Sequence, residues 1–430
     1  MQRIELNYGR GRLPVDLPDA IDLRVVRKRQ MPVLPDPEAA VREALARPTG
    51  APPLSELARG KKSACILVCD ITRPVPNGLF LPILLEQLLD AGLGSERIKI
   101  VVATGLHRPN EGEELAELVG SRWVLQTVEV ANHFARDESA HADLGTTRAH
   151  GVPVKLDRRL VEAELKIATG LVEPHFMAGW SGGRKVIAPG VAHKDTITTF
   201  HSARFMEHPR ATSCNLEGNP LHETQLEIVE MLGGALALNT VIDEERRLSF
   251  VNFGEIVASH LEAVRHMSEY AEVPLAERFG TVVTSAAGYP LDKTYYQTVK
   301  GMVTPIEIMA PGADLIIASA CSEGIGSKEF ADAQRRLVER GPERFLEEIS
   351  AKRFADIDEW QTEMQLKPMR IGSIQLYSDG LGEAERQLTG VKMIGSVAAA
   401  VEASVARTGD RRVAVIPEGP YVVPVYRPAA

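Results

Sequence analysis

Short apolar runs alternate with helical patterns along the chain. CILVCD at 65–70 and IKIVVATG at 98–105 have the continuous apolar character of buried strands. Helices are predicted at 79–92, which ends at a glycine, and at 110–120. Further strands are predicted at 165–170, 281–286, 314–320, 373–378 and 412–419. Strands that are apolar on both faces and separated by helices are typical of parallel sheets in α/β proteins.

The length of the chain indicates more than one domain. A single hydrophobic core rarely extends over 430 residues, so two domains are expected. A polar, proline-containing stretch at 271–280 precedes a new strand, and a second α/β unit is expected to begin there. The predicted fold is therefore two domains, each a mostly parallel sheet flanked by helices, with the active site in the cleft between them.

Composition and charge narrow the class of protein. Hydrophobic residues make up 44% of the chain and charged residues 25%, as in soluble globular proteins. The net charge of −9 argues against nucleic acid or an acidic membrane as the main partner. No apolar run approaches the roughly 20 residues that span a bilayer, and the N-terminal residues lack the apolar core of a signal peptide. Four scattered cysteines predict a reducing, cytoplasmic setting.

Polar side chains follow five of the predicted strands. In open α/β sheets, ligands bind beyond the carboxyl ends of the strands. The residues in such positions are Asp70, Thr72 and Arg73; His107 and Arg108; His175 and Lys185; Tyr296, Gln297 and Lys300; and the loop 321–330. Each group alone is compatible with a structural role, such as an ion pair, a helix cap or a solvated helix face. Together they predict one cleft between two domains.

The segment SGGRK, which ends at Lys185, is more specific. Its glycines allow backbone N–H groups to converge on an anion, and the lysine can neutralise that anion or form a covalent bond. The alternative is a tight glycine turn with an exposed lysine. Two histidines can serve as acid and base on opposite sides of a substrate, and a third can ligate a soft metal. Because metalloprotease and nucleophile-elbow motifs are absent, spacing alone leaves the reaction open.

Taken together, these segments resemble the nickel-dependent lactate racemase family over nearly the full length of the chain. The segments that carry the resemblance are CDITRPVP (69–76), ATGLHRP (103–109), EPHFMAGWSGGRKVIAPG (173–190), the histidine of FHSARF (200–205), GYPLDKTYYQTVKGM (288–302) and DEWQ (358–361).

The resemblance implies a cofactor, the nickel-pincer nucleotide. This is a pyridinium mononucleotide whose two sulfurs and one ring carbon bind nickel. By position, Lys185 would hold it covalently through a thioamide, and His201 would be the fourth nickel ligand. Other residues implied to contact the cofactor are Asp70, Ser181, Gly182, Gly183 and Trp360. Cofactor-maturation enzymes are implied as partners.

The resemblance also implies the reaction. The protein would be a racemase or epimerase that inverts the Cα of a 2-hydroxy acid by reversible hydride transfer to the cofactor. His107 and His175 would be the acid and base. The substrate would be held by Arg73, Tyr296, Gln297 and Lys300. Family members accept lactate, malate and other 2-hydroxy acids, so the substrate stays open, as does which histidine serves which face.

Two alternative functions are also compatible with the sequence, and the family resemblance implies a division into domains. The chain could instead be a nickel-free phosphate-binding transferase that uses the SGGRK loop, or a non-catalytic cofactor-binding protein. The family plan implies a cofactor-tethering domain at 1–272 with a returning segment at about 364–388. The second domain would comprise 273–363 and 389–430 and would close the cleft.

Overall fold

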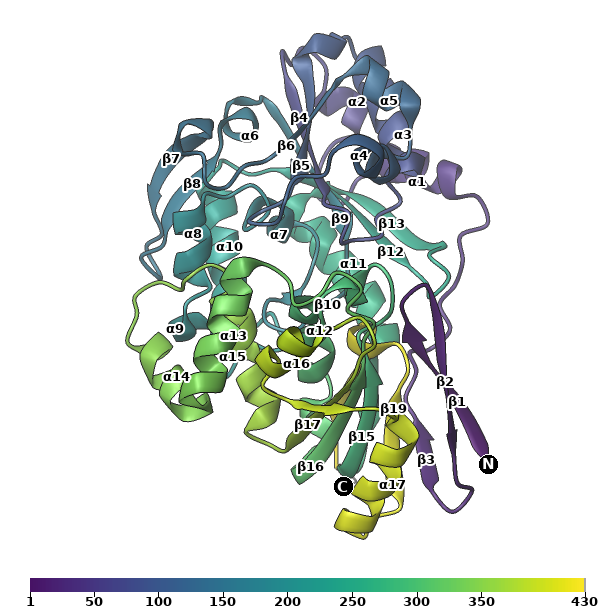
Figure 1. Ribbon diagram of the computed structural model, residues 1–430. Coiled ribbons are helices and arrows are strands. Elements are labelled where there is room, and N and C mark those ends of the chain that lie inside the picture. The colour runs from purple at the N-terminus through teal and green to yellow at the C-terminus, as the bar shows by residue number, and fades with distance from the viewer. Residues whose placement is uncertain (429–430) are drawn as a thin grey trace.

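The first sheet has the strand order β13-β12-β9-β4-β5-β6 in the computed structural model, which describes residues 1–428 (Figure 1). Five of its strands are parallel, and only β13 runs antiparallel, beside β12. Its strands are β4 (Ala64–Cys69), β5 (Ile98–Ala103), β6 (Glu129–Asn132), β9 (Leu165–Leu171), β12 (Leu236–Ile242) and β13 (Leu248–Glu255). The strands predicted at 65–70, 98–105 and 165–170 are confirmed.

Helices cover both faces of this sheet. Ile66 and Val68 of β4 face one hydrophobic cluster, whereas Cys65 and Leu67 face another, so the central strand is apolar on both sides. The first cluster includes α1 (Pro37–Ala46), α2 (Leu54–Leu57), α3 (Asn77–Asp90), α4 (Gly112–Val119) and α5 (Arg122–Thr127). The second includes α6 (Arg158–Glu162), α7 (Arg184–Ile187), α8 (Lys194–Phe200) and α10 (Pro220–Met231). α11 (Ile256–Ala271) closes the first domain.

The second sheet is fully parallel, with the order β18-β17-β16-β15-β19-β3. Its strands are β3 (Asp22–Val25), β15 (Phe279–Ser285), β16 (Met309–Ala318), β17 (Ser373–Tyr377), β18 (Lys392–Ile394) and β19 (Arg412–Ile416). One face is covered by α17 (Val397–Thr408) and by the hairpin of β1 (Gln2–Tyr8) and β2 (Gly11–Leu17). On the other side are α12 (Tyr295–Val303), α13 (Lys328–Arg340) and α15 (Glu359–Met369). The predicted α/β class and two-sheet plan are confirmed.

Three segments differ from the predicted domain boundaries. The hairpin of β1 and β2, within 1–272, packs against the second sheet. β3, within 1–272, pairs with β19 and is an edge strand of the second sheet. β17, within the predicted returning segment 364–388, lies between β16 and β18. The sequence of β3, DLRV, is too short and polar to show which sheet it joins, whereas buried Ile374 and Leu376 commit β17 to the second core. The final residues of the predicted second domain, 429–430, lie outside the described residues.

α15 is the part of the returning segment that does contact the first domain. Leu366 packs against Ala203 of α9 (Ala203–Met206), and Arg370 forms an ion pair with Glu207 at 2.8 Å. α15 therefore belongs to the second lobe and contacts the first lobe through its side chains.

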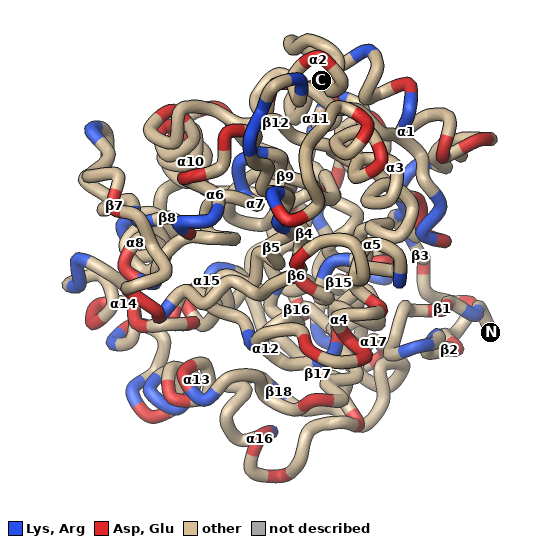
Figure 2. Tube along the Cα trace, turned by 90° about the horizontal axis from the view of Figure 1, so that it is seen from above, with Lys and Arg blue, Asp and Glu red and all other residues tan. Residues whose placement is uncertain are grey.

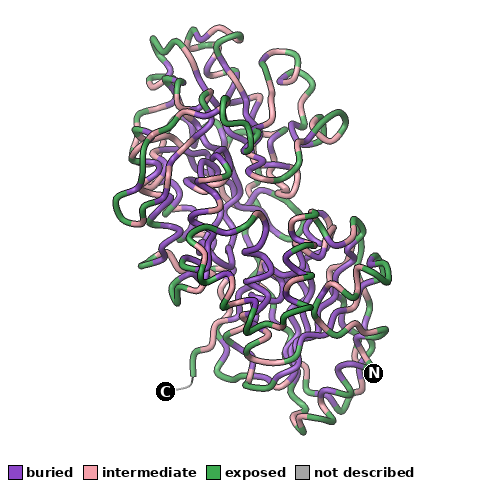
Figure 3. Tube along the Cα trace, turned by 60° about the vertical axis from the view of Figure 1, so that its left-hand side comes forward, coloured by how far each residue is buried: buried purple, intermediate pink, exposed green. Residues whose placement is uncertain are grey.

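The two lobes share one continuous core. The largest cluster of buried apolar side chains contains residues of both sheets, and Figure 3 shows buried chain passing from one lobe to the other. Basic and acidic residues are intermixed along the chain (Figure 2). Among residues 1–428, no helix is both long and apolar enough to cross a bilayer.

Candidate active site

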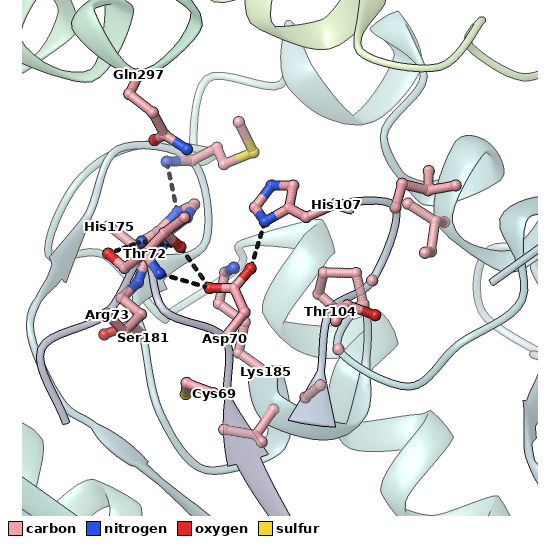
Figure 4. Close-up of a pocket in the computed structure, with 18 of the residues that line it drawn as sticks. Cys69, Asp70, Thr72, Arg73, Thr104, His107, His175, Ser181, Lys185 and Gln297 are labelled. Atoms are coloured by element: carbon pink, nitrogen blue, oxygen red, sulfur yellow. Dashed lines mark hydrogen bonds and ion pairs between the residues drawn. The ribbon is translucent and has the colours of Figure 1, made fainter. Parts of the chain in front are cut away.

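Polar side chains of both domains line one cavity of about 140 Å³ at the carboxyl ends of β4, β5 and β9. α12 and the start of α15 form its opposite wall. Every residue that the resemblance assigns to the site lines this cavity except Gly183, whereas Arg108 and the loop 321–330, named from strand ends, do not line it. Figure 4 shows how His107, His175 and Lys185 surround Asp70 from different segments of the chain. The prediction of one interdomain cleft is confirmed.

Asp70 and His107 form a carboxylate–imidazole pair. Asp70 directly follows β4 and His107 follows β5, and their side chains meet at 2.5 Å between Oδ2 and Nδ1. The other carboxylate oxygen accepts hydrogen bonds from the backbone N–H and the hydroxyl of Thr72. Burial alone would raise the pKa of Asp70, but His107, Thr72 and Arg73 lower it below its usual range. Asp70 is therefore an ionised partner that orients the imidazole.

His175 lies in a different environment. It is buried at the end of β10 (Pro174–His175), and its Nδ1 accepts hydrogen bonds from the backbone N–H groups of Met177 and Ala178. Burial, together with the positive charges of Lys185 and Lys300, lowers its pKa well below the usual value. The neutral imidazole is the stable form of His175 in this cavity.

Three cationic side chains make the cavity suitable for anions. Arg73 pairs with Glu173 at 3.2 Å, and both side chains are largely buried. Burial, reinforced by Arg73, lowers the pKa of Lys185 to about 7. Burial, together with the positive charges of Arg73 and Lys185, lowers the pKa of Lys300 well below its usual value. An anion that enters the cavity would relieve this repulsion and gain charge-assisted hydrogen bonds.

His201 has the geometry of a metal ligand. It ends α8, and its Nδ1–H donates to the carbonyl of Ile197 at 2.9 Å, which leaves the Nε2 lone pair available. Burial lowers its pKa to about 3, so the ring is neutral at physiological pH. A hydrogen bond from one ring nitrogen to a carbonyl is the usual support for an imidazole that binds metal through the other. Trp360 lies beside it, with ring centroids 4.9 Å apart.

The glycine turn before Lys185 is a packed and rigid segment. The hydroxyl of Ser181 donates to the carbonyl of Leu171 at 2.8 Å, so its side chain holds the loop together. Gly183 caps α7 and lies outside the cavity, where it contacts the ring of His260. The buried Arg184 donates to the carbonyls of Ala178 and Trp180. These contacts fix the backbone from which Lys185 projects.

Substitution of Gly183 by alanine is expected to destabilise the fold. Its φ is +49°, and an added Cβ would lie 2.9 Å from the His260 ring. The conformational strain and the clash together predict a loss of roughly 1–3 kcal/mol in unfolding free energy. Urea unfolding measures this loss. Gly395→Ala is the matched control, since a Cβ there meets no atom within 4 Å; equal stability of the two variants would contradict the prediction.

α12 and α15 supply the wall contributed by the second domain. The indole N–H of Trp360 donates to the Tyr296 hydroxyl at 3.2 Å, and Gln361 donates to the Tyr296 carbonyl at 2.6 Å. Gln297 lines the same wall, and its buried Oε1 has no hydrogen-bond partner among the described residues. Such a buried group requires a partner, which a bound ligand can supply.

Several residues of the site were not predicted from the sequence. Glu173, the partner of Arg73, and Asp358, which lines the cavity with a φ of +63°, were not singled out. Cys69 was not proposed for the site either, yet it lines the cavity, and burial raises the pKa of its thiol to about 11. Only the position of Glu173 and Cys69 at strand ends could have indicated them.

This arrangement defines a class of protein. Two imidazoles, a weakly basic amine, a guanidinium and a metal-competent histidine lie in one cleft between two α/β domains. Such a set can bind a small anion and move protons on it, which is the work of an enzyme.

Comparison with known proteins gives the family. The lactate racemase N-terminal domain family matches residues 8–214, and the lactate racemase C-terminal domain family matches residues 276–424. Lactate racemase of Thermoanaerobacterium thermosaccharolyticum is 32% identical, over 98% of this chain and 99% of that protein. Lactate racemase of Lactiplantibacillus plantarum is 31% identical, over 89% of each chain. The chain therefore belongs to the lactate racemase family, and it is an isomerase of the racemase type.

Solved structures agree with this assignment. The lactate racemase apoprotein from Thermoanaerobacterium thermosaccharolyticum superposes with a TM-score of 0.90 at 30% identity, and the match covers 98% of this chain and all of that one. A Thermotoga maritima protein shares the fold, with a TM-score of 0.71 at 19% identity over 91% of this chain and 98% of its own.

Proposed function

We propose that this protein inverts the Cα of a 2-hydroxy acid, with lactate as the first substrate to test and malate as the second. Two similar relatives are lactate racemases. The observation that carries the proposal is the placement of His107 and His175 in one cavity with Arg73 and Lys300. Two imidazoles can serve the hydroxyl group of either enantiomer, while the cations bind the carboxylate.

The cavity also fits the proposed cofactor, a nickel-pincer nucleotide. His201 offers a neutral imidazole with a free lone pair, which suits a soft divalent metal such as nickel. Lys185 has a pKa of about 7, so a large fraction of it is an unprotonated amine able to form the covalent thioamide tether. When bound, the cofactor supplies a reversible hydride acceptor. The proposal includes separate maturation enzymes and a reducing cytoplasm, in which the four free cysteines would persist.

The polar residues of both domains would hold the substrate. The guanidinium of Arg73 can bind a carboxylate through two N–H groups, and Lys300 can add a third contact. Gln297 and Tyr296 project from α12 on the opposite wall. Anchoring the carboxylate fixes Cα between the two imidazoles, so that a planar keto acid can turn one face or the other without leaving.

The imidazoles would move the hydroxyl proton. His107 can accept it at Nε2, because Asp70 holds Nδ1–H and stabilises the imidazolium that forms. His175 lies in the same cavity and serves the product oxygen. Trp360 and the buried wall of α15 restrict water, which protects a bound keto acid from loss.

The buried lysine predicts a pH-dependent effect on the stability of the apoprotein. The pKa of Lys185 is about 7 in the folded state and near 10.5 when unfolded, so the unfolded chain binds its proton more tightly. Stability from this group is therefore lost as pH falls from about 10.5 to 7. Lys185→Met is expected to raise the Tm by several degrees at about pH 7 and by less at about pH 10. Lys392→Met, at an exposed position, is the control; a pH-independent difference would contradict the assignment.

The proposed function is tested with single enantiomers. The loaded enzyme should convert either enantiomer of its acid into the racemate, and Cα deuterium should be retained because the hydride returns to the same carbon. Failure to invert any 2-hydroxy acid while the cofactor is bound would favour a non-catalytic binding protein. Phosphoryl or acyl transfer by the nickel-free protein would favour the transferase alternative.

A further inference from the structure

The two histidines of the cavity differ in which ring nitrogen can carry a proton. His107 contacts the ionised carboxylate of Asp70 through Nδ1 at 2.5 Å. A carboxylate only accepts, so Nδ1 of His107 must carry the proton. In the neutral ring, Nε2 is then a bare lone pair, and His107 is an acceptor toward the cavity that it lines.

His175 has the opposite arrangement. Its Nδ1 lies 3.4 Å from the backbone nitrogen of Met177 and 3.2 Å from that of Ala178, and both are N–H donors. A proton on Nδ1 would face two other protons, so the neutral ring carries its proton on Nε2. Toward the cavity, His175 is therefore a donor.

The surrounding charges reinforce this difference. The groups facing His107 are Asp70, which follows β4, Tyr296 from α12, and Asp358, which precedes α15. The groups facing His175 are cationic or neutral: Lys185, Lys300, Arg73 and His201. Glu173 is engaged with Arg73. An added positive charge is therefore tolerated on His107 and opposed on His175.

We infer that the resting enzyme is asymmetric, with His107 preset as the proton acceptor and His175 preset as the hydrogen-bond donor. This inference rests on the proposed function for its kinetic consequences, although the tautomers are a property of the protein alone. Asp70 and the backbone N–H groups of Met177 and Ala178 are then positioning groups, because they act only through the imidazoles.

The asymmetry distinguishes the two enantiomers. An enantiomer whose hydroxyl faces His107 would donate its proton to Nε2, which forms the imidazolium, and the product oxygen, held by the Nε2–H of His175, would then regain the proton that His107 holds. The other enantiomer meets the Nε2–H of His175, which binds its oxygen but cannot take its proton. Its proton must instead be relayed to Nε2 of His107, because the backbone N–H groups of Met177 and Ala178 keep the proton of His175 on Nε2. That enantiomer binds more tightly and reacts more slowly.

The equal free energy of the two enantiomers determines how kcat and KM can differ between them. Enantiomers have equal free energy, so kcat/KM must be the same in both directions. The enantiomer facing His175 is expected to have both kcat and KM lower by the same factor. That factor is roughly five to thirty, as one or two kcal/mol of hydrogen bonding would give.

The first test uses the apoprotein and needs no turnover. Long-range proton–nitrogen NMR of protein labelled with ¹⁵N-histidine, at about pH 8, identifies the tautomer of each neutral ring. His107→Gln and His175→Gln assign the two signals among eleven histidines. The expected result is an Nδ1–H tautomer for His107 and an Nε2–H tautomer for His175. The same tautomer for both rings would overturn the inference.

The second test uses the loaded enzyme and initial rates from each pure enantiomer. Matched decreases of kcat and KM for one enantiomer support the inference, and equal values for both enantiomers overturn it. Absence of any inversion would refute the proposed function instead, and the NMR result would still decide the tautomers.

Discussion

Replacement of His107 by glutamine is expected to lower the rate of inversion by roughly 10²–10⁴-fold, the contribution of a well-placed acid–base group. Glutamine retains a polar side chain of similar length but cannot exchange a proton. The measurement is the loss of optical activity of a single enantiomer, followed by polarimetry or chiral chromatography.

The same variant should leave cofactor loading unchanged. The side chain of His107 forms its hydrogen bond with Asp70, and neither Lys185 nor His201 is among the hydrogen-bond partners of His107. The neighbouring Arg108 forms a surface ion pair with Glu114. Intact mass of the variant should therefore show the same adduct as the parent protein. Inversion at the parent rate would show that His107 is not an acid–base group.

Replacement of Arg73 by methionine should have two large and separable effects. Loss of the guanidinium removes the main partner of the substrate carboxylate, which predicts a decrease in kcat/KM of roughly a hundredfold or more. It also leaves Glu173 unpaired, with only 10% of its side chain exposed. Breaking a buried ion pair in this way costs roughly 3–5 kcal/mol of stability. Initial rates and urea unfolding of the apoprotein measure the two effects.

A double variant separates the two effects. Arg73→Met with Glu173→Gln removes both charges, so most of the stability should return, while kcat/KM should remain low. Recovery of activity together with stability would mean that Arg73 acts only by holding Glu173. Full activity in the single variant would place the carboxylate elsewhere in the cavity.

The pattern of apolar residues was sufficient to predict the class of fold, but not the edge strands or the sheet that each strand joins. β4, β9 and β15 were predictable because both of their faces are buried, which leaves a continuous apolar run. β3 was not, because an edge strand with the sequence DLRV has almost no buried face, and it joins the sheet through backbone hydrogen bonds to β19. β17 was assigned to the wrong domain, since an apolar strand does not identify the sheet that it enters.

For the site, individual residues were predictable from the sequence, but the contacts between them were not. Strand ends and the resemblance together named Lys185, His201 and the two histidines proposed as acid and base. The pairing of Asp70 with His107, and of Arg73 with Glu173, depends on which loops meet in space, and no local pattern encodes that. The opposite tautomers of the two histidines depend on backbone N–H groups, which are present at nearly every position of any sequence.

The proposed function depends most on Lys185 as the tether of a nickel-containing nucleotide. Its most direct test is the intact mass of the protein produced together with cofactor-building enzymes and nickel, with Lys185→Ala prepared in parallel. We expect an adduct containing sulfur and phosphate that maps to Lys185 and is absent from the variant. An unmodified chain under conditions that load another lactate racemase, or an adduct that persists in Lys185→Ala, would contradict it.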